Sequence, residues 1–458
     1  MSDTHFAESL TNQLGNISYN LNLPAIVYLN YFYEIKGLIK QNNVKSIDLV
    51  LAGDIFEITR TGFWLKDEVR PYLDLNDIKS GSIVEQRILE ILDAIGQDPR
   101  VSKTLEVFRD LDRILEVPVS LHYVPGNHDR LANSTPAVIS KINQLLGLVG
   151  PEKRFDNQFI YYVEEEPLVL VRHGHEYDPV NFSVDVNKLV EIPYFFLQEE
   201  YDKPNAGDFV VVEVASRLPL FFKEQYTEER IISDPYLFTL YQRLIEFDNV
   251  RPATALLNYL FATPGIPMKE TWKILEPVFV KILVDLSEKE EALNNFIAYY
   301  KKQSLGAIFI GSLLKMKFWY KRIPYWFIRL LMKLIARNLK VKDTRPIISR
   351  EAFLKDKTSG IRCLVFGHTH LATVEILGVK NGNDIYSINS GTWRMQVPAS
   401  PDFSDFGRLR SLTKVLIFGK NEKNPEYDGK EDWSFDFNSE IGYGPEQGFY
   451  VIETDSVI

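Results

Sequence analysis

The sequence is poor in cysteine and has no long apolar run. Cys363 is the only cysteine in 458 residues, so the chain cannot form an internal disulfide, and nothing in its cysteine content indicates an oxidising compartment. No uninterrupted apolar run reaches the roughly 18 residues that a membrane-spanning helix needs, and no signal-peptide pattern follows Met1. These absences favour a cytoplasmic protein that is soluble or peripheral to a membrane.

The chain also has fewer basic than acidic residues. The chain has 52 Lys and Arg residues against 62 Asp and Glu residues, which gives a formal net charge of -10 at pH 7. This balance argues against a broad cationic surface for duplex nucleic acid, although it is compatible with a local basic patch. A polyanionic substrate would need local cations to receive it. The mixture of 45% hydrophobic and 25% charged residues is typical of a globular protein.

Several apolar segments have the composition of strands and end in a polar cluster. The predicted strands lie in KSIDLVLAGD (45–54), VSLHYV (119–124), FIYYVEEE (159–166), PLVLVRHGHE (167–176), IRCLVFGHTH (361–370) and DIYSINSGTW (384–393). Helical patterns cover residues 24–41 and lie near 102–115 and 136–147. Strands that alternate with helices and end in polar residues are typical of α/β enzymes, whose ligands bind beyond the carboxyl edge of the sheet.

Residues 181–345 depart from this alternation. They are rich in aromatic residues and poor in strand signals, and their pattern is mainly helical. We expect them to form an insertion or cap between two halves of one catalytic core, which would comprise residues 1–180 and 346–458.

The insertion contains a basic stretch in an otherwise acidic chain. Pro324 is placed to open a helix with a basic and an apolar face. By helical spacing the basic face has Arg329, Lys333, Arg337 and Lys340, and the apolar face has Phe327, Leu330, Leu331, Leu334 and Ile335. Such a helix suits an anionic membrane interface, which residues 311–342 would contact. The alternative is a cap helix that packs on the core with its charges in solvent.

Six of the seven histidines lie in polar clusters, and only His122 lies outside them. With the neighbouring carboxylates and an amide, they form a ligand set that suits divalent ions such as Mn, Fe or Zn. The set comprises Asp3, His5, Asp54, Asn127, His128, His173, His175, His368 and His370. A single histidine at a strand end is more often structural, but six at such positions favour metal binding. Two cations about 4 Å apart also need a shared anionic ligand.

These clusters resemble, in their order along the chain, the motifs of the calcineurin-like metallophosphoesterases. The matching motifs are Asp3-Thr-His5, Gly53-Asp54, Gly126-Asn127-His128-Asp129, His173-Gly-His175 and Gly367-His368-Thr-His370. The resemblance covers residues 1–180 and 346–395. It implies a four-layer α/β/β/α sandwich with two mixed β-sheets, to which the helical insertion is added, and a centre of two divalent metal ions.

The resemblance also implies a role for each motif. One metal would be held by Asp3, His5 and His370, and the other by Asn127, His173 and His368, with Asp54 as the bridge. A metal-bridging hydroxide would attack phosphorus in line. His128 would donate a proton or hydrogen bond to the phosphoryl group or leaving oxygen, and Asp129 would orient its ring and raise its pKa. His175 would contact the substrate or a metal ligand.

The N-terminus departs from the family pattern. A full strand precedes the Asp-x-His motif in the family, whereas only Met1 and Ser2 precede Asp3 here. Either the chain begins later than a longer natural form, or the place of that strand is filled otherwise. The alternative is that SDTH is an ordinary polar N-terminus, which would leave one metal site with too few ligands.

Further residues suggest how a substrate would be held. Arg60 and Arg394 lie near the predicted rim of the site and are candidates for bidentate phosphate contacts. Glu57 is placed to hold a metal ligand through a hydrogen bond. The GDIFE segment (53–57) and the basic helical insertion are together similar to the UDP-diacylglucosamine pyrophosphohydrolase branch, which acts on a lipid-linked phosphate. Lipid phosphates, nucleotides, other phosphorylated small molecules and phosphoproteins all stay open as substrates.

Three functions are compatible with these features. The leading interpretation is a two-metal phosphohydrolase. A nuclease of the same fold is the second, and the acidic balance of the chain counts against it. The third is a non-catalytic scaffold that uses the fold to bind proteins, and the complete ligand set counts against that.

Overall fold

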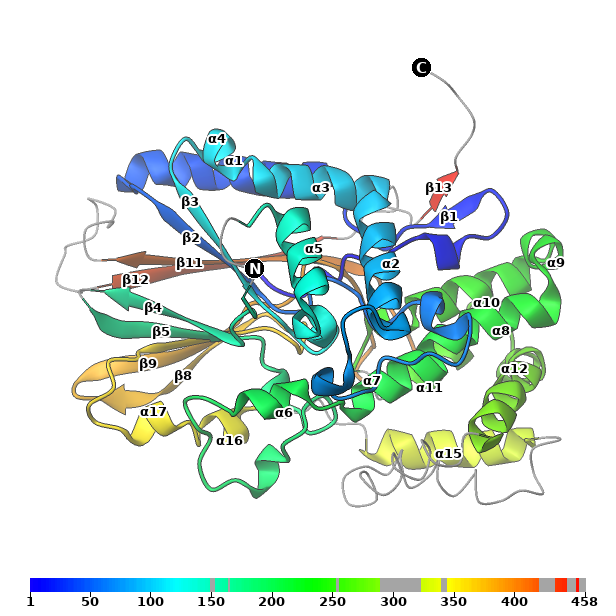
Figure 1. The fold of residues 1–458 in the computed structure, drawn as a ribbon. Coiled ribbons are helices and arrows are strands. Elements are labelled where there is room, and N and C mark those ends of the chain that lie inside the picture. Colours follow the sequence, from blue (N-terminus) through cyan, green and yellow to red (C-terminus); the bar gives the residue numbers. More distant parts are fainter. Residues whose placement is uncertain are drawn as a thin grey trace.

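The computed structural model describes residues 1–148, 153–163, 165–252, 255–288, 323–338, 344–419, 433–442 and 450–452. Within these ranges the protein is a mixed α/β structure with several β-sheets (Figure 1). The α/β class expected from the sequence is therefore confirmed.

A five-stranded mixed sheet has the strand order β4-β5-β7-β9-β8. Its strands are β4 (Gln158–Val163), β5 (Glu166–Arg172), β7 (Cys363–Phe366), β9 (Asn383–Asn389) and β8 (Thr373–Lys380). The central strands β5, β7 and β9 are parallel, and β4 and β8 pair antiparallel at the two edges. The carboxyl ends of β5 and β7 therefore meet at one edge, which is where the histidine motifs begin.

The other strands form smaller sheets. One is the parallel pair β2 (Ile47–Ala52) and β3 (Val119–Val124). The second has four strands in the order β12 (Trp433–Gly442), β11 (Leu409–Gly419), β10 (Met395–Pro398) and β6 (Val250–Arg251). The third is the pair β1 (Ile17–Tyr19) and β13 (Tyr450–Ile452). Within the second of these sheets, β6 and β10 run parallel and the other pairs are antiparallel. The β6 strand was not predicted, because two residues give no readable pattern.

Apolar side chains join these sheets face to face. Ala52 of β2, Val169 of β5, Val365 of β7 and Trp433 of β12 belong to one buried cluster between the sheets. Cys363 lies in the same cluster and is fully buried, as its place in an apolar strand predicts. The five-stranded sheet therefore packs against β2, β11 and β12.

Helices cover the outer faces of the sheets. On the β2–β3 side these are α1 (Ala25–Asn42), α2 (Ile83–Gln97), α3 (Pro99–Arg109), α4 (Leu111–Leu115) and α5 (Pro136–Leu146). On the outer face of the five-stranded sheet lie α16 (Arg345–Ile348) and α17 (Ala352–Lys355). Figure 1 shows α1, α3 and α4 above the strands and α16 and α17 below them.

Local capping explains where the core helices begin. Ser82, Asp98 and Thr135 each accept backbone N–H groups of the first turn of α2, α3 and α5. One prediction was wrong, because the single helix expected near 102–115 is two helices. They meet at Asp110, whose backbone N–H bonds to the carbonyls of Glu106 and Val107 and closes α3.

The described part of residues 181–345 is mainly helical. It contains α6 (Gln198–Asp202), α7 (Ala206–Val210), α8 (Arg217–Tyr226), α9 (Glu228–Ser233), α10 (Pro235–Ile245), α11 (Leu256–Phe261), α12 (Met268–Glu288) and α15 (Tyr325–Asn338). All of these helices except α6 share an apolar cluster around Phe222, Leu244 and Leu275. The β6 strand ties this helical part to the core, because it pairs with β10.

Pro324 precedes α15, and its carbonyl accepts the N–H groups of Phe327 and Ile328. Ile328 is buried against the helical cluster, whereas Trp326 and Leu330 are about half exposed, at 58% and 48%. Leu330, expected on the apolar face, therefore lies on the outer side of the helix. Residues 311–322 and 339–342 lie outside the described ranges, so the membrane contact stays a prediction. In the described residues, no helix is both long and apolar enough to span a bilayer.

Candidate metal centre

The first six residues run alongside the end of β2. The N–H of Ala52 donates to the Met1 carbonyl at 2.7 Å, that of Asp3 to Gly53 at 3.0 Å, and that of His5 to Asp54 at 2.9 Å. Asp3 and His5 are almost fully buried. The backbone pairing and burial exclude an ordinary solvent-exposed polar segment for SDTH.

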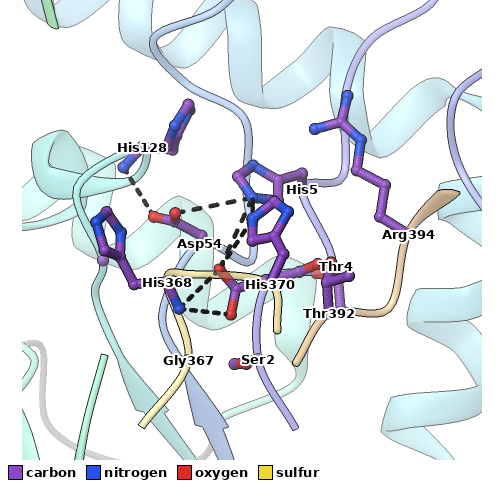
Figure 2. Close-up of polar contacts among 12 residues, drawn as sticks. Ser2, Thr4, His5, Asp54, His128, Gly367, His368, His370, Thr392 and Arg394 are labelled. Atoms are coloured by element: carbon purple, nitrogen blue, oxygen red, sulfur yellow. Dashed lines mark hydrogen bonds and ion pairs between the residues drawn. The ribbon is translucent and has the colours of Figure 1, made fainter. Parts of the chain in front are cut away.

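All five motifs meet at the carboxyl edge of the strands. Asp54 follows β2, Asn127 and His128 follow β3, His173 follows β5, and His368 follows β7. Figure 2 shows Asp54 between His128 and His5, with the two histidines of the Gly367 turn beside them. Residues more than 300 positions apart in the chain are thus placed in one buried cluster.

One group consists of Asp3, His5 and His370. The Nε2 atom of His370 lies 3.3 Å from Asp3 Oδ1 and 3.2 Å from the Nε2 atom of His5. Each of the three residues offers a ligand atom, and these atoms lie within 4.8 Å of one another. This is the set that the resemblance assigns to one metal.

The second group contains Asp54, His173 and His368, whose ligand atoms also lie within 4.8 Å of one another. The Nε2 atom of His173 is 3.1 Å from Asp54 Oδ2 and 3.2 Å from Asn127 Oδ1. Because His5 Nε2 is only 3.7 Å from the same Asp54 oxygen, Asp54 lies between the two groups.

The donor chemistry and burial of both groups fit divalent cations. Buried carboxylates and imidazoles are normally paired or coordinate a metal. Here Asp3, Asp54 and His173 are almost fully buried, and their polar atoms converge. The described residues therefore contain buried His and Asp groups that can bind metal ions. A third grouping of His5, Asp54 and His128 makes His128 an alternative ligand.

Charges inside the cluster shift the pKa values of its members. Burial alone would raise the pKa of Asp54, but the positive charges of His173 and His128 hold it well below its usual range. Burial would lower the pKa of His173, but Asp54 and Asp3 raise it to about 10. Burial raises the pKa of Asp3 to about 7. The cluster thus favours a bound positive charge, whether a proton or a cation.

Glu57 is the carboxylate that orients His128. Its Oε1 lies 2.6 Å from His128 Nδ1, and its Oε2 lies 3.0 Å from His5 Nδ1. Burial would lower the pKa of His128, but Glu57 and Asp54 outweigh burial and raise it to about 10. Glu57 therefore makes the expected hydrogen bond to a candidate metal ligand, which is His5. It also holds the ring of His128, the predicted proton donor.

Asp129 has a different role from the one predicted. Its carboxylate accepts the backbone N–H groups of Asp54, Ile55, Phe56 and Gly126. The prediction that it orients His128 was wrong, because four amides of the turns after β2 and β3 already occupy its oxygens. Asp129 therefore fixes the backbone that presents Asp54.

His175 lies beside His173, a member of the second ligand group, with the two ring centroids 5.3 Å apart. Its ring makes edge contacts with Phe182 and Tyr201, and its side chain is buried. Burial lowers its pKa to about 4. His173 is the member of the His-Gly-His motif that joins a possible metal group, and His175 contacts the ring of that candidate ligand, as one of its two expected roles has it. The substrate contact of His175 stays a prediction.

Three residues outside the motifs also reach the centre. The Asp178 carboxylate lies 3.3 Å from His368 Nε2. Arg251, from β6, donates to His370 Nδ1 at 2.6 Å, and Asp248 lies close by, between Arg60 and Arg394. The sequence carried no signal for Asp248 or Arg251, because both belong to the helical insertion. Asp178 lies five residues after His173, and the sequence indicated only that a carboxylate is close to that motif, not that it contacts His368.

We expect Gly53→Ala to disrupt the centre. Gly53 has φ of +83°, and an added Cβ would meet the His173 ring and lie 2.6 Å from His173 Cβ. Alanine is strained at a positive φ, and this strain and the clash should together lower the free energy of unfolding by about 2–4 kcal/mol. The control is Gly37→Ala in α1, where an added Cβ meets nothing within 4 Å and should be neutral or mildly stabilising. Equal denaturation midpoints for the two variants would contradict this.

Asp248 should make the protein sensitive to acid. Burial would raise its pKa, but Arg60, His128 and Arg394 lower it to about 2. Because the folded pKa lies below the usual 3.8, the contribution to stability is present above that value and is lost as pH falls through 2. Its size is on the order of 2 kcal/mol. The free energy of unfolding, measured by denaturation at pH 7 and at pH 2.5, should fall less between these pH values for Asp248→Asn than for the wild type. An equal fall in the two proteins would contradict the lowered pKa of Asp248.

Comparisons with known proteins do not place the chain in a family. No family model matches the sequence, and no curated protein matches it. The geometry of the centre is therefore the basis for a functional assignment.

Proposed function

We propose that the protein is a phosphohydrolase that uses two divalent metal ions and has the calcineurin-like metallophosphoesterase fold. The observation that carries this proposal is the position of Asp54. It lies between the group of Asp3, His5 and His370 and the group that His173 forms with Asn127 and His368. A carboxylate between two sets of neutral and acidic donors is the arrangement that a pair of cations requires.

The layered packing supports the fold part of the proposal. Helices α1 to α5 cover β2 and β3, a second apolar cluster joins β2, β11 and β12 to the five-stranded sheet, and α16 and α17 cover the far face. This succession is compatible with a four-layer α/β/β/α sandwich.

The residues around the cations have distinct tasks. When bound, the cations would lower the pKa of the attacking water and neutralise charge on the phosphoryl oxygens. His128 would carry a proton at neutral pH, because Glu57 and Asp54 raise its pKa. Since Nδ1 faces Glu57, Nε2 is the atom free to donate to the leaving oxygen. Glu57 would hold the ring in that orientation.

Metal analysis combined with hydrolysis of an aryl phosphate monoester and diester tests this function. We expect about two metal ions per chain and turnover of at least one of the esters. His368→Ala should lose metal and activity, whereas His122→Ala should keep both, because His122 bonds to Asp48 on β2 and lies outside the centre. Less than one metal per chain with no turnover would instead favour a binding scaffold. Cleavage of DNA in the presence of Mn, with neither ester hydrolysed, would favour a nuclease.

A further inference from the structure

A cleft lies beside Glu57, and no histidine is among its described lining residues. It has a volume of about 200 Å³ and lies between the loop that follows β2, the N-terminal loop and α8. This is far above the ~10–15 Å³ that one water molecule needs. Four cationic residues line it, namely Arg60, Lys66, Lys223 and Arg394, and Glu57 is the only carboxylate among its described lining residues.

Arg394 is the unusual member of this lining. Its side chain is only 2% exposed, and none of its three guanidinium nitrogens has a hydrogen-bond partner among the described residues. The nearest carboxylates are Asp248 at 3.7 Å and Glu57 at 3.8 Å, both beyond hydrogen-bond distance. A buried guanidinium without hydrogen bonds is costly, so this residue needs an acceptor that the described chain does not supply.

The one carboxylate in the cleft is already engaged. Glu57 binds His5 and His128 and accepts the backbone N–H of Arg60 at 3.0 Å. The Arg60 side chain donates to the Ile245 carbonyl and lies 3.6 Å from Asp248. Lys66 lies 4.0 Å from Glu90 and Lys223 lies 3.6 Å from Glu228, so these cations also have carboxylate partners outside the cleft. The Arg394 guanidinium is left without a hydrogen bond among the described residues, and its planar fork matches the oxygens of a phosphoryl group.

We infer that this cleft binds a phosphoryl-type oxyanion, held chiefly by Arg394 with Arg60 beside it. Glu57 lines the cleft and bonds to His5 and His128, and no candidate metal ligand is among the described lining residues. The anion bound here is therefore distinct from the phosphoryl group that the cations would hold. Lys66, which is half exposed and lies 4.0 Å from Glu90, adds a cation at the more exposed part of the lining. The oxyanion is either a second phosphoryl group of the substrate or a free phosphate ion.

Calorimetric titration of the full chain with inorganic phosphate tests the site. The titration uses an Asp54→Asn background to disable the metal centre, so its result does not depend on the proposed hydrolysis. We expect one phosphate per chain, and about tenfold weaker binding after Arg394→Lys or Lys66→Glu. Lys66 is half exposed, so its variant should fold even if the Arg394 variant does not.

The matched control is Lys40→Glu, at an exposed position on α1 outside the cleft. Absence of phosphate binding in the Asp54→Asn protein would overturn the inference, and so would equal affinities for the Lys66→Glu and Lys40→Glu proteins.

Kinetics with two substrates identify the source of the oxyanion. If it belongs to the substrate, Lys66→Glu should raise the ratio of KM for a sugar bisphosphate to KM for a sugar monophosphate about tenfold. Lys40→Glu should leave that ratio unchanged. If the ligand is free phosphate, the ratio should stay at its wild-type value in both variants, while the calorimetric loss at Lys66 persists.

Discussion

Asp54→Asn should remove both metal ions and reduce turnover by about 10³-fold or more. Asp54 is the one carboxylate between the two groups of ligands, and it is 1% exposed. Metal ions contribute several kcal/mol to the stabilisation of the transition state, and each 1.4 kcal/mol is a factor of about ten in rate. Loss of the shared negative charge should therefore affect both cations at once.

The asparagine variant is chosen to keep the fold. Its side-chain oxygen can still accept the backbone N–H of His128, which donates to Asp54 Oδ1 at 2.8 Å. Metal content by elemental analysis and turnover of an aryl phosphate should fall together, while circular dichroism shows native secondary structure. Retention of two metals by this variant would show that the bridge has been assigned to the wrong residue.

His128→Asn should lower turnover by about 10²–10⁴-fold and leave the metal content unchanged. Its Nδ1 faces Glu57, and only its backbone N–H contacts Asp54, which the asparagine variant preserves. Elemental analysis of the purified variant is the decisive measurement. Loss of metal would instead make His128 a ligand, which its proximity to His5 and Asp54 allows.

Glu57→Gln tests the same assignment through pH. Glu57 raises the pKa of His128, so removal of its charge should let His128 lose its proton at lower pH. The alkaline limb of the turnover profile should then move to lower pH. Asp129→Asn is the control, because Asp129 contacts backbone amides and not the His128 ring. A larger shift in the Asp129 variant than in the Glu57 variant would contradict this role.

The positions of the motifs were predictable because they follow strands. Asp54, Asn127, His173 and His368 each stand directly after an apolar run, and the carboxyl ends of such strands converge. The partner of His128 was not predictable from adjacency. Asp129 is its neighbour in sequence, but the turn after β2 places Glu57 against the ring.

The contributions of the insertion could not be predicted either. Arg251 and Asp248 reach the centre because the two-residue strand β6 pairs with β10, a contact between segments about 150 residues apart. Pairing at that separation depends on tertiary packing and leaves no periodic pattern in the sequence.

The backbone conformation of the centre affects when the centre forms during folding. Asp3, His5, Asp54, His368 and His370 all have positive φ, between 45° and 67°. Asp and His tolerate this region better than most residues, yet each such residue costs roughly 1–3 kcal/mol. Together they amount to about 5–15 kcal/mol, which equals the net stability of a typical domain. Local preferences therefore oppose these turns, and the centre should form only once the two sheets have closed around it.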